Sequence, residues 1–283
     1  MEAKETNITP QAELPILEVE HLRVQFTSDS GTTTAVVDES FSIRPGETLA
    51  LVGESGSGKS VTSLSVMRLV EHGGGKIVNG SIKLRCRDGR VVDLRHANKS
   101  ELQHLRGSEV AMIFQEPMTS LNPVFTVGAQ IAESLILHRG MDEKEALKEA
   151  VQLLELVRIP DAERISLGFP HQLLIADEPT TALDVTVQAQ ILALISELQK
   201  EIGMAVLFIT HDMGVVAQIA DRVAVMRYGE IVESGTAQAI FAHPQHPYTQ
   251  ALLSAVPRLG ALKDIEHPCF FRLIDPDNGK VIE

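Results

Sequence analysis

The sequence predicts an α/β fold around a mainly parallel central sheet. Short apolar runs alternate with amphipathic segments of helical spacing, the pattern of buried strands covered by helices. A glycine-rich segment, Gly53 to Ser60, follows one apolar run, and the acidic pair Asp177-Glu178 follows another. Ligand-binding side chains gather at the carboxyl ends of strands in such sheets, so these two segments define the expected site.

The first half of the chain is predicted to contain more strand than helix. Alternating apolar and polar residues over 16–26 predict a half-exposed strand, and 35–43 is the expected return strand after a turn-rich stretch at 28–34. Further elements are expected as a buried strand at 48–52, a helix at 60–70 ended by the glycines 73–75, a hairpin at 77–94 turning at Asp88-Gly89, a helix at 99–106 and a strand at 110–114.

The second half is predicted to begin with helices alone. Residues 128–138 and 143–159 have amphipathic spacing with no strand between them, which indicates a helical insert in an α/β fold. The alternation then resumes, with strands expected at 173–176, 205–209 and 223–226 and helices at 185–200 and 213–220.

Composition limits the classes of protein to consider. The 283 residues suffice for one large α/β domain or two small ones, and none of their apolar runs reaches 18 residues, the length that would span a membrane. Residues 1–11 do not resemble a signal peptide, so a cytosolic location is expected. The net charge of -13, without a basic face, argues against nucleic acid and anionic lipid as partners. Cys86 and Cys269 lie far apart, which disfavours a metal site or a disulfide.

The glycine-rich segment has the features of a phosphate-binding loop. Its residues match the pattern GxxxxGK[ST] between a strand and a helix: Gly53, Glu54, Ser55, Gly56, Ser57, Gly58, Lys59 and Ser60. The glycines let successive backbone amides point at an anion, and the helix opening at Lys59 adds the positive end of its dipole. Lys59 is expected to reach the β- and γ-phosphates of ATP, and Ser60 to bind Mg²⁺. The context disfavours the alternative, a glycine-rich turn without a ligand.

Four polar residues at strand ends are expected around the γ-phosphate. Asp177 is suited to holding Mg²⁺, and Glu178 to orienting or deprotonating a water. Gln115 is expected to bind a water and the metal, and His211 to contact the γ-phosphate. By itself an acidic pair after a strand is often a helix cap, and a single histidine is often an ordinary polar residue. Their shared placement at strand ends favours the functional interpretation.

Four sequence strings together resemble the ATP-binding cassette (ABC) ATPase family. GESGSGKS, FQEPMTSLNP, LLIADEPTTALD and FITHDM resemble its Walker A, Q-loop, Walker B with D-loop, and H-switch motifs, and the likeness extends over about 16–259. It implies a P-loop cassette with a mixed central sheet and an N-terminal antiparallel β-subdomain. It adds Val61 and Asp184 to the nucleotide site and makes Phe26 the aromatic that stacks on adenine, although Phe26 also fits as an ordinary strand residue.

A second likeness concerns the branch of the family. HPQHPYTQALLSAVPRL resembles the peptide, nickel and glutathione importers, and IFQEPMTSLNPVFTVGAQIAES and AVPRLGALKD are similar to the first cassette of a two-cassette glutathione importer. This implies transport-coupled ATP hydrolysis at the cytoplasmic face of the inner membrane. The implied partners are permease subunits docking at 115–135, a second cassette and, indirectly, a periplasmic solute-binding protein. His243 and His246 invite a metal interpretation, but the neighbouring prolines favour a loop.

The predicted organisation is a single cassette at 14–260. Residues 1–13 are expected to be a flexible N-terminus, about 116–172 a helical insert, and 261–283 a tail or the start of an interdomain linker. Asp275 to Gly279 superficially resembles a calcium loop, but its glycine comes one position too early, so a turn is expected.

One departure from the family pattern is internal. In relatives an LSGGQ-like signature and a helix separate a PHQ-like string from Walker B, whereas here Gln172 runs directly into Leu173 and Ser-Gly-Gly occurs nowhere. Roughly 20 residues are missing, about 25–30 Å of helix, which truncates the helical subdomain and is expected to expose core surface.

The missing signature changes the expected activity. In the family the signature of one cassette completes the ATP site of its partner, so a homodimer of this chain should hydrolyse ATP very poorly. A partner cassette with an intact signature is therefore needed. The alternatives left open are a non-hydrolysing nucleotide-binding remnant, a regulatory partner or a fragment of a two-cassette protein. A DNA-repair or translation ATPase is disfavoured by the acidic charge and the HPYT-type segment.

Overall fold

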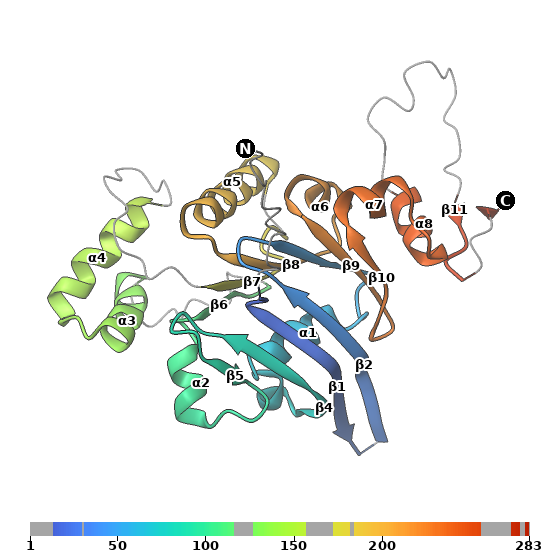
Figure 1. Ribbon diagram of the computed structural model, residues 1–283. Helices are drawn as coiled ribbons and strands as arrows, with labels where there is room; N and C mark the ends of the chain where they lie inside the picture. The colour runs from blue at the N-terminus through green and yellow to red at the C-terminus, as the bar shows by residue number, and fades with distance from the viewer. Residues whose placement is uncertain are drawn as a thin grey trace, which may run out of the picture.

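The computed structural model describes residues 14–29, 31–115, 127–156, 172–181, 184–255, 273–277 and 281–282. Two sheets enclose the main core. The strands of the antiparallel sheet are β1 (Leu17–Ser28), β2 (Gly31–Ile43), β4 (Gly75–Arg85) and β5 (Val91–Asp93), in the order β2-β1-β4-β5. This sheet is the N-terminal antiparallel β-subdomain expected from the resemblance, and it lies in front of the central sheet in Figure 1.

The central sheet is mixed, as predicted. Its six strands have the order β10-β9-β3-β8-β7-β6, and only the β9–β10 pair is antiparallel. The strands are β3 (Thr48–Val52), β6 (Val110–Ile113), β7 (Leu173–Asp177), β8 (Ala205–Thr210), β9 (Arg222–Arg227) and β10 (Glu230–Thr236). The carboxyl ends of β3, β6, β7 and β8 meet at one edge of the sheet, which places the predicted site there.

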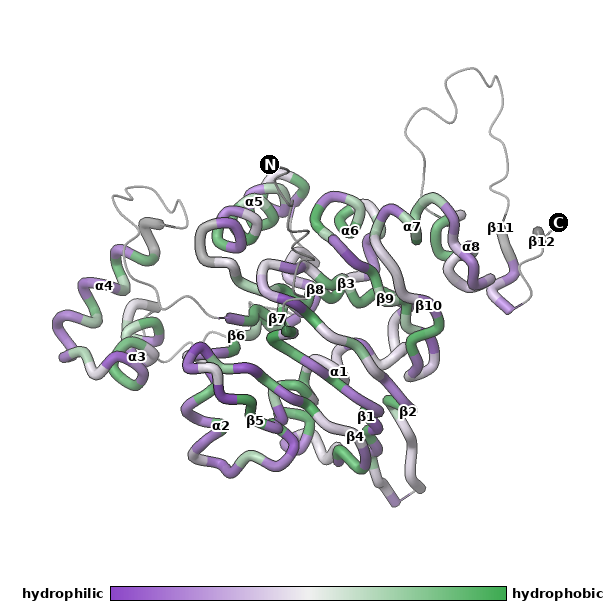
Figure 2. The backbone as a smooth tube through the Cα atoms, in the orientation of Figure 1, coloured by the Kyte–Doolittle hydropathy of each residue, from purple (hydrophilic) through white to green (hydrophobic). Residues whose placement is uncertain are grey.

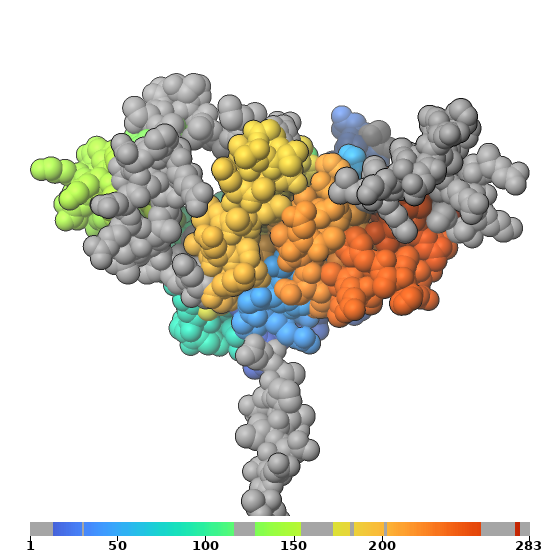
Figure 3. Space-filling view, turned by 90° about the horizontal axis from the view of Figure 1, so that it is seen from above, coloured from blue at the N-terminus to red at the C-terminus, as the bar shows by residue number. Residues whose placement is uncertain are grey.

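Helices cover both faces of the central sheet. Between the two sheets lies α1 (Lys59–Val66), while α5 (Val185–Ile202), α6 (Met213–Ile219), α7 (Ala237–Ala242) and α8 (Pro247–Ser254) lie on the other side. Figure 3 shows α5, α6 and the α7–α8 pair side by side across that face. A short helix, α2 (Lys99–Leu105), lies beside the antiparallel sheet.

Side-chain alternation along the buried strands divides the core into layers. Leu49, Leu51, Leu173 and Ile175 point into the cluster shared with α1 and the antiparallel sheet. The residues between them point to the opposite face, where Ala50 and Val52 meet α6, α7 and α8 and Leu174 and Ala176 meet α5. Figure 2 shows this concentration of apolar residues in the central strands. All five residues of β7 are buried, which explains why its sequence lacks a polar face.

The helical insert forms its own small core. Helices α3 (Val127–Arg139) and α4 (Glu143–Leu156) pack through Ala132, Leu135, Ala146 and Ala150 and stand apart from the central sheet in Figure 1. Both helices were predicted, whereas residues 157–159 lie outside the described residues. Within the described part of the chain, no helix combines the length and apolar composition needed to cross a membrane.

Several sequence-based boundaries were wrong. The helix expected at 60–70 ends at Val66, because Arg68 adopts a left-handed φ of 50° and a 3-10 turn, η1 (Val70–Gly73), follows. The hairpin expected to turn over 28–34 is tighter, since β2 already begins at Gly31 and Thr27 pairs with Thr32. Strand β10, helices α7 and α8, and a two-stranded hairpin of β11 (Leu273–Ile274) and β12 (Val281–Ile282) were missed. The turn expected around Asp275 is present at 276–277.

Candidate functional site

The phosphate-binding loop connects β3 to α1, and close backbone approaches at two glycines shape it. A Cβ atom on Gly53 would lie 2.2 Å from the carbonyl oxygen of Met226 in β9. One on Gly58, where φ is 108°, would lie 2.7 Å from the carbonyl oxygen of Ala35 in β2. Only glycine fits at either position, because any side chain would push the loop away from these strands. The required glycines therefore hold the loop in its place at the edge of the sheet.

Lys59 is buried inside this loop. Its Nζ donates to the carbonyl oxygens of Gly53 at 2.7 Å and Glu54 at 2.9 Å, and reaches Oγ of Ser57 at 3.5 Å. Burial lowers the pKa of the ammonium group, since the charged form loses its hydration. The partners of the cation are neutral carbonyl groups, and a phosphate offers a charged acceptor that forms stronger hydrogen bonds. Lys59, which is predicted to bind phosphate, therefore has only neutral hydrogen-bond acceptors in the loop, and these compete weakly with a phosphate group.

Asp177, at the end of β7, meets the start of α1. Its Oδ1 accepts a hydrogen bond from Ser60 Oγ at 3.2 Å, and its Oδ2 accepts one from Ser63 Oγ at 3.1 Å. Burial raises the pKa of the carboxyl group. The juxtaposition of Ser60 and Asp177 was predicted, but the role of Ser63 was missed. Its spacing of three residues from Ser60 was the available signal, because residues three apart share one helix face.

Glu178 forms the second polar cluster. It adopts a left-handed φ of 46°, an uncommon conformation for a residue other than glycine. Its Oε2 accepts from Gln115 Nε2 at 3.1 Å and from Thr181 Oγ1 at 2.9 Å, and its Oε1 lies 3.3 Å from Nδ1 of His211. The structure thus brings Gln115, Glu178 and His211 together from the ends of three neighbouring strands. Thr181 was missed, although it lies only three residues after the glutamate.

The remaining predicted residues lie around these two clusters. Ser55 and Gly56 belong to the loop, and Val61 is partly buried against the core on α1. Phe26 is half-buried on β1, where its ring packs close to Gly75, so adenine stacking stays a prediction. Asp184 is the N-cap of α5 and accepts from two amides in the first turn of that helix.

The chemistry of these residues fits a nucleotide with a divalent cation. The loop offers backbone amides and a lysine to phosphate, while Ser60 and Asp177 offer oxygen ligands. In the described part of the chain, no three His, Cys, Asp or Glu side chains form a group that could hold a metal ion. Mg²⁺ typically takes one or two carboxylates and completes its coordination with substrate phosphates and water. The few protein ligands here are therefore suited to Mg²⁺ bound together with a phosphate group.

The loop expected around His243 and His246 is present at 243–246, and residues 247–254 after it form α8, a helix that was not predicted. His246 caps this helix, its Nδ1 accepting from the amide of Tyr248 at 3.1 Å, and Pro247 occupies the first helical position. Proline suits that position because its missing N–H would lack a helical partner anyway. The His-Pro pair before an apolar run was the overlooked signal. The Tyr248 hydroxyl also accepts a hydrogen bond of 3.0 Å from the backbone amide of Glu54 in the phosphate-binding loop.

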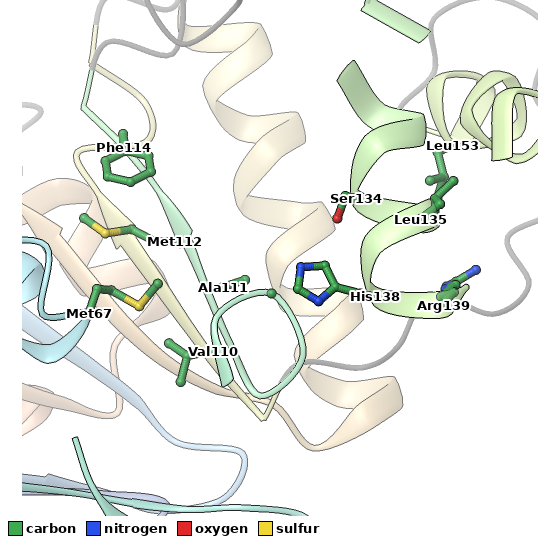
Figure 4. A pocket seen from close by; sticks show the side chains of 11 residues that line it. Met67, Val110, Ala111, Met112, Phe114, Ser134, Leu135, His138, Arg139 and Leu153 are labelled. Atoms are coloured by element: carbon green, nitrogen blue, oxygen red, sulfur yellow. The ribbon is translucent and has the colours of Figure 1, made fainter. Parts of the chain in front are cut away.

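A cavity of about 450 Å³ separates β6 from the helical insert. Figure 4 shows Ser134 and His138 of α3 on one side and Ala111 of β6 on the other. Phe114, beside β6, is 43% exposed, and Ala111, Met112 and Ile113 are partly exposed. β6 is the edge strand of the central sheet and is partly exposed here, whereas all five residues of β7 are buried, and the exposure of core surface expected from the missing segment stays a prediction. Of the residues 115–135 that are expected to dock on the permease, those at 116–126 lie outside the described residues.

Comparison with protein families gives two matches. Residues 36–173 match the family described as ABC transporter, and residues 232–269 match the one described as the C-terminal region of oligopeptide/dipeptide transporters. The first match ends at the first residue of β7, and the second spans α7 and α8. The first match includes the phosphate-binding loop, and the second includes Tyr248 of α8, which contacts that loop.

Curated relatives include the glutathione import ATP-binding protein GsiA. The Pectobacterium atrosepticum protein is 54% identical over 288 aligned positions, which cover 95% of this chain and 46% of the relative. The Escherichia coli K12 protein is 55% identical over 279 positions, covering 92% and 45%. The chain thus spans about half the length of these relatives. Since 95% of 283 residues is about 269, about 19 of the 288 aligned positions have no residue from this chain.

Solved structures confirm the fold class. The ATP-binding cassette MJ0796, in a dimeric post-hydrolysis state bound to ADP and Pi, superposes with a TM-score of 0.64 at 22% identity, covering 78% of this chain and 98% of that one. The cbiO1 protein of Clostridium perfringens, part of the ABC transporter complex cbiONQ, gives 0.62 at 24% identity, covering 89% and 100%. At these identities the likeness establishes the α/β cassette architecture alone.

Proposed function

The chain belongs to the ABC transporter family, and we propose that it is the ATP-binding subunit of an importer for a small peptide such as glutathione. One observation carries the nucleotide part of this proposal, namely the meeting of Lys59, Ser60 and Asp177 at the carboxyl ends of β3 and β7. The sequence identity to proteins named for glutathione import supports a small peptide such as glutathione as the transported solute.

Each polar residue of the site has a role in phosphoryl transfer to water. Lys59 would bind the β- and γ-phosphates in place of its carbonyl partners, and Ser60 and Asp177 would hold Mg²⁺. The metal supplies charge neutralisation at the phosphate oxygens. Glu178 orients or deprotonates the attacking water, and its bonds to Gln115 and Thr181 fix its carboxylate beside His211. Gln115 and His211 thereby position the base through their contacts with its carboxylate.

The family membership also suggests the assembly. The proposed partners are permease subunits and a second cassette at the cytoplasmic face of the inner membrane, with a periplasmic solute-binding protein acting indirectly. Both C-terminal helices fall within the match to oligopeptide/dipeptide transporters, which favours a peptide importer over other ABC systems.

We further propose that the chain hydrolyses ATP poorly by itself. Gln172 enters the sheet immediately before β7, donating its amide to the Glu109 carbonyl at 3.0 Å and accepting from the Ala205 amide at 2.8 Å. No LSGGQ-like segment precedes it, and the roughly 19 unmatched alignment positions agree with a missing signature helix. A pair of identical chains then has two phosphate-binding loops and no signature to complete either site. A partner with an intact signature completes only the site over this chain's loop.

The second candidate is a non-hydrolysing nucleotide-binding remnant or regulatory partner. The direct connection of Gln172 to Leu173 favours this candidate. The partly exposed residues of β6 that line the cavity beside α3 favour it as well. In this case the loop binds nucleotide, but neither self-association nor an intact cassette yields turnover.

Nucleotide binding and steady-state ATP turnover of the purified chain separate these proposals. We expect micromolar to millimolar ATP binding that depends on Mg²⁺, turnover near background for the chain alone, and restored turnover with an intact cassette. ATP turnover by the chain without a partner would refute the proposal that it hydrolyses ATP poorly by itself. Binding without turnover in any mixture would select the second candidate, and absence of nucleotide binding would refute both.

A further inference from the structure

Helix α8 touches the phosphate-binding loop at one backbone group. The Glu54 amide donates to the hydroxyl of Tyr248 at 3.0 Å, although the two residues are 194 positions apart. The carbonyl group of the same residue accepts from Nζ of Lys59 at 2.9 Å and from the amide of Ser57 at 3.2 Å. Both backbone polar groups of Glu54 are therefore bonded. The carbonyl is bonded within the phosphate-binding loop, and the amide is bonded to α8.

Tyr248 is held rigidly enough to act as an anchor. Its side chain is 1% exposed and packs in the core cluster beneath α6 and α7. The start of its helix is fixed by Glu233 of β10, whose carboxylate accepts from the amides of Gln245 at 2.8 Å and His246 at 3.0 Å. The phenol hydroxyl therefore has a position defined by the sheet and not by the loop.

Arg227 holds the tyrosine ring from the other side. Its guanidinium lies 4.9 Å from the ring centroid of Tyr248 and 4.7 Å from that of Tyr228. It also donates to the carbonyl of Pro276 at 3.1 Å and pairs with Asp277 at 2.7 Å. Arg227 and the two tyrosines line a hollow of about 60 Å³ together with loop residues 54–57.

We propose that Tyr248 is a positioning residue for nucleotide binding, acting through the Glu54 amide. This proposal rests on the nucleotide-binding function above and adds a residue outside the P-loop motif to it. The hydroxyl keeps the first turn of the loop in the conformation that directs the later amides and Lys59 toward phosphate. Without this bond the loop gains conformational freedom, and ordering it again on binding lowers the affinity.

The chain offers a matched pair of variants, because it contains two tyrosines and no tryptophan. Tyr248→Phe removes the hydroxyl bonded to the loop and keeps the buried ring. Tyr228→Phe removes a hydroxyl from the exposed ring on the opposite side of the same arginine, where the side chain is 78% exposed. Both variants are titrated with ATP and Mg²⁺, and intrinsic tyrosine emission is recorded with thermal unfolding of the nucleotide-free proteins.

The expected result is that Tyr248→Phe weakens ATP binding roughly 3- to 10-fold, the loss of one hydrogen bond, while Tyr228→Phe binds like wild type. After correction for light absorbed by ATP, binding should change the tyrosine emission of wild type and Tyr228→Phe but not of Tyr248→Phe. A merely structural tyrosine would lower the unfolding temperature and leave the affinity unchanged.

The outcomes distinguish the two proposals. Nucleotide binding by wild type with equal or tighter affinity in Tyr248→Phe would overturn the positioning role and leave the proposed function intact. An emission change that persists in Tyr248→Phe would also overturn it, because the signal would then come from Tyr228. Failure of wild type and both variants to bind nucleotide would instead refute the proposed function. Hydrogen exchange at the Glu54 amide, expected to be faster only in Tyr248→Phe, tests the contact directly.

Discussion

The hydroxyl of Ser60 lies 3.2 Å from Oδ1 of Asp177, although 117 positions separate the two residues in the chain. One is in the first turn of α1 and the other at the end of β7, and the buried central sheet holds both elements. A hydroxyl and a carboxylate are thus already adjacent before any metal arrives. This arrangement leaves little reorganisation for Mg²⁺ binding, and several predictions about the site depend on it.

Asp177→Asn is expected to remove most of the Mg²⁺ dependence of ATP binding. The amide keeps the shape of the side chain but loses the negative charge that a hard divalent cation requires. ATP affinity is measured with Mg²⁺ and with EDTA, and the ratio should fall toward one in the variant. Asp212→Asn is the matched control, because Asp212 caps α6 and asparagine also caps helices. An unchanged Mg²⁺ effect in Asp177→Asn would contradict the assignment.

Lys59→Ala is expected to weaken ATP binding roughly 10- to 100-fold, since it removes charge-assisted hydrogen bonds to phosphate. Lys99→Ala, at the exposed start of α2, changes the net charge equally and should bind like wild type. Equilibrium binding of a fluorescent ATP analogue measures both affinities. Equal affinity in the two variants would show that nucleotide binds elsewhere on the chain.

Glu39 is expected to make folding stability depend on pH. Its carboxyl group on β2 is fully buried against α1, where Oε2 accepts from Thr62 at 2.8 Å and Oε1 has no partner. Burial raises its pKa from the ordinary value of 4.5 to about 8, so between these two pH values the folded state keeps a proton that the unfolded state loses. The contribution of Glu39 to stability is therefore greatest below pH 4.5 and falls as the pH rises toward 8.

Glu39→Gln tests this effect, because glutamine imitates the protonated acid and does not ionise. Relative to the variant, wild type should lose about 2 kcal/mol of unfolding free energy between pH 6 and pH 8. Urea unfolding at both pH values measures the difference. Asp38→Asn, at a neighbouring exposed acid, should keep the wild-type pH dependence. A parallel pH dependence in Glu39→Gln would mean that Glu39 is ionised in the folded protein.

Asp184→Ala is expected to destabilise the protein by about 1 kcal/mol, the usual cost of losing an N-cap. Its carboxylate accepts from the amides of Thr186 at 2.9 Å and Val187 at 3.0 Å, which otherwise have no partner within α5. Asp184→Asn should retain most of the stability, because the amide oxygen also caps. Equal loss in both variants would indicate that the charge matters more than the hydrogen bonds.

Local patterns in the sequence were sufficient for most of the fold. Apolar runs and turn residues predicted every parallel strand of the central sheet, since strands buried on both faces leave a strong local signal. The missed elements have weaker signals. Strand β10 has only two apolar residues, the adjacent Ile231 and Val232, and so lacks an alternating pattern. Helices α7 and α8 are short, and their stability comes from packing on the sheet.

The sequence by itself determined the glycine-rich loop, the paired acids and the absence of an LSGGQ-like string, because each of these is a contiguous string or its absence. Tertiary structure decided which groups meet across the chain. It placed Ser63 on Asp177, gathered Gln115 and His211 around Glu178, and brought Tyr248 to the Glu54 amide. The physical reason is that these contacts depend on strand order and helix packing, which bring together residues that no local sequence pattern links.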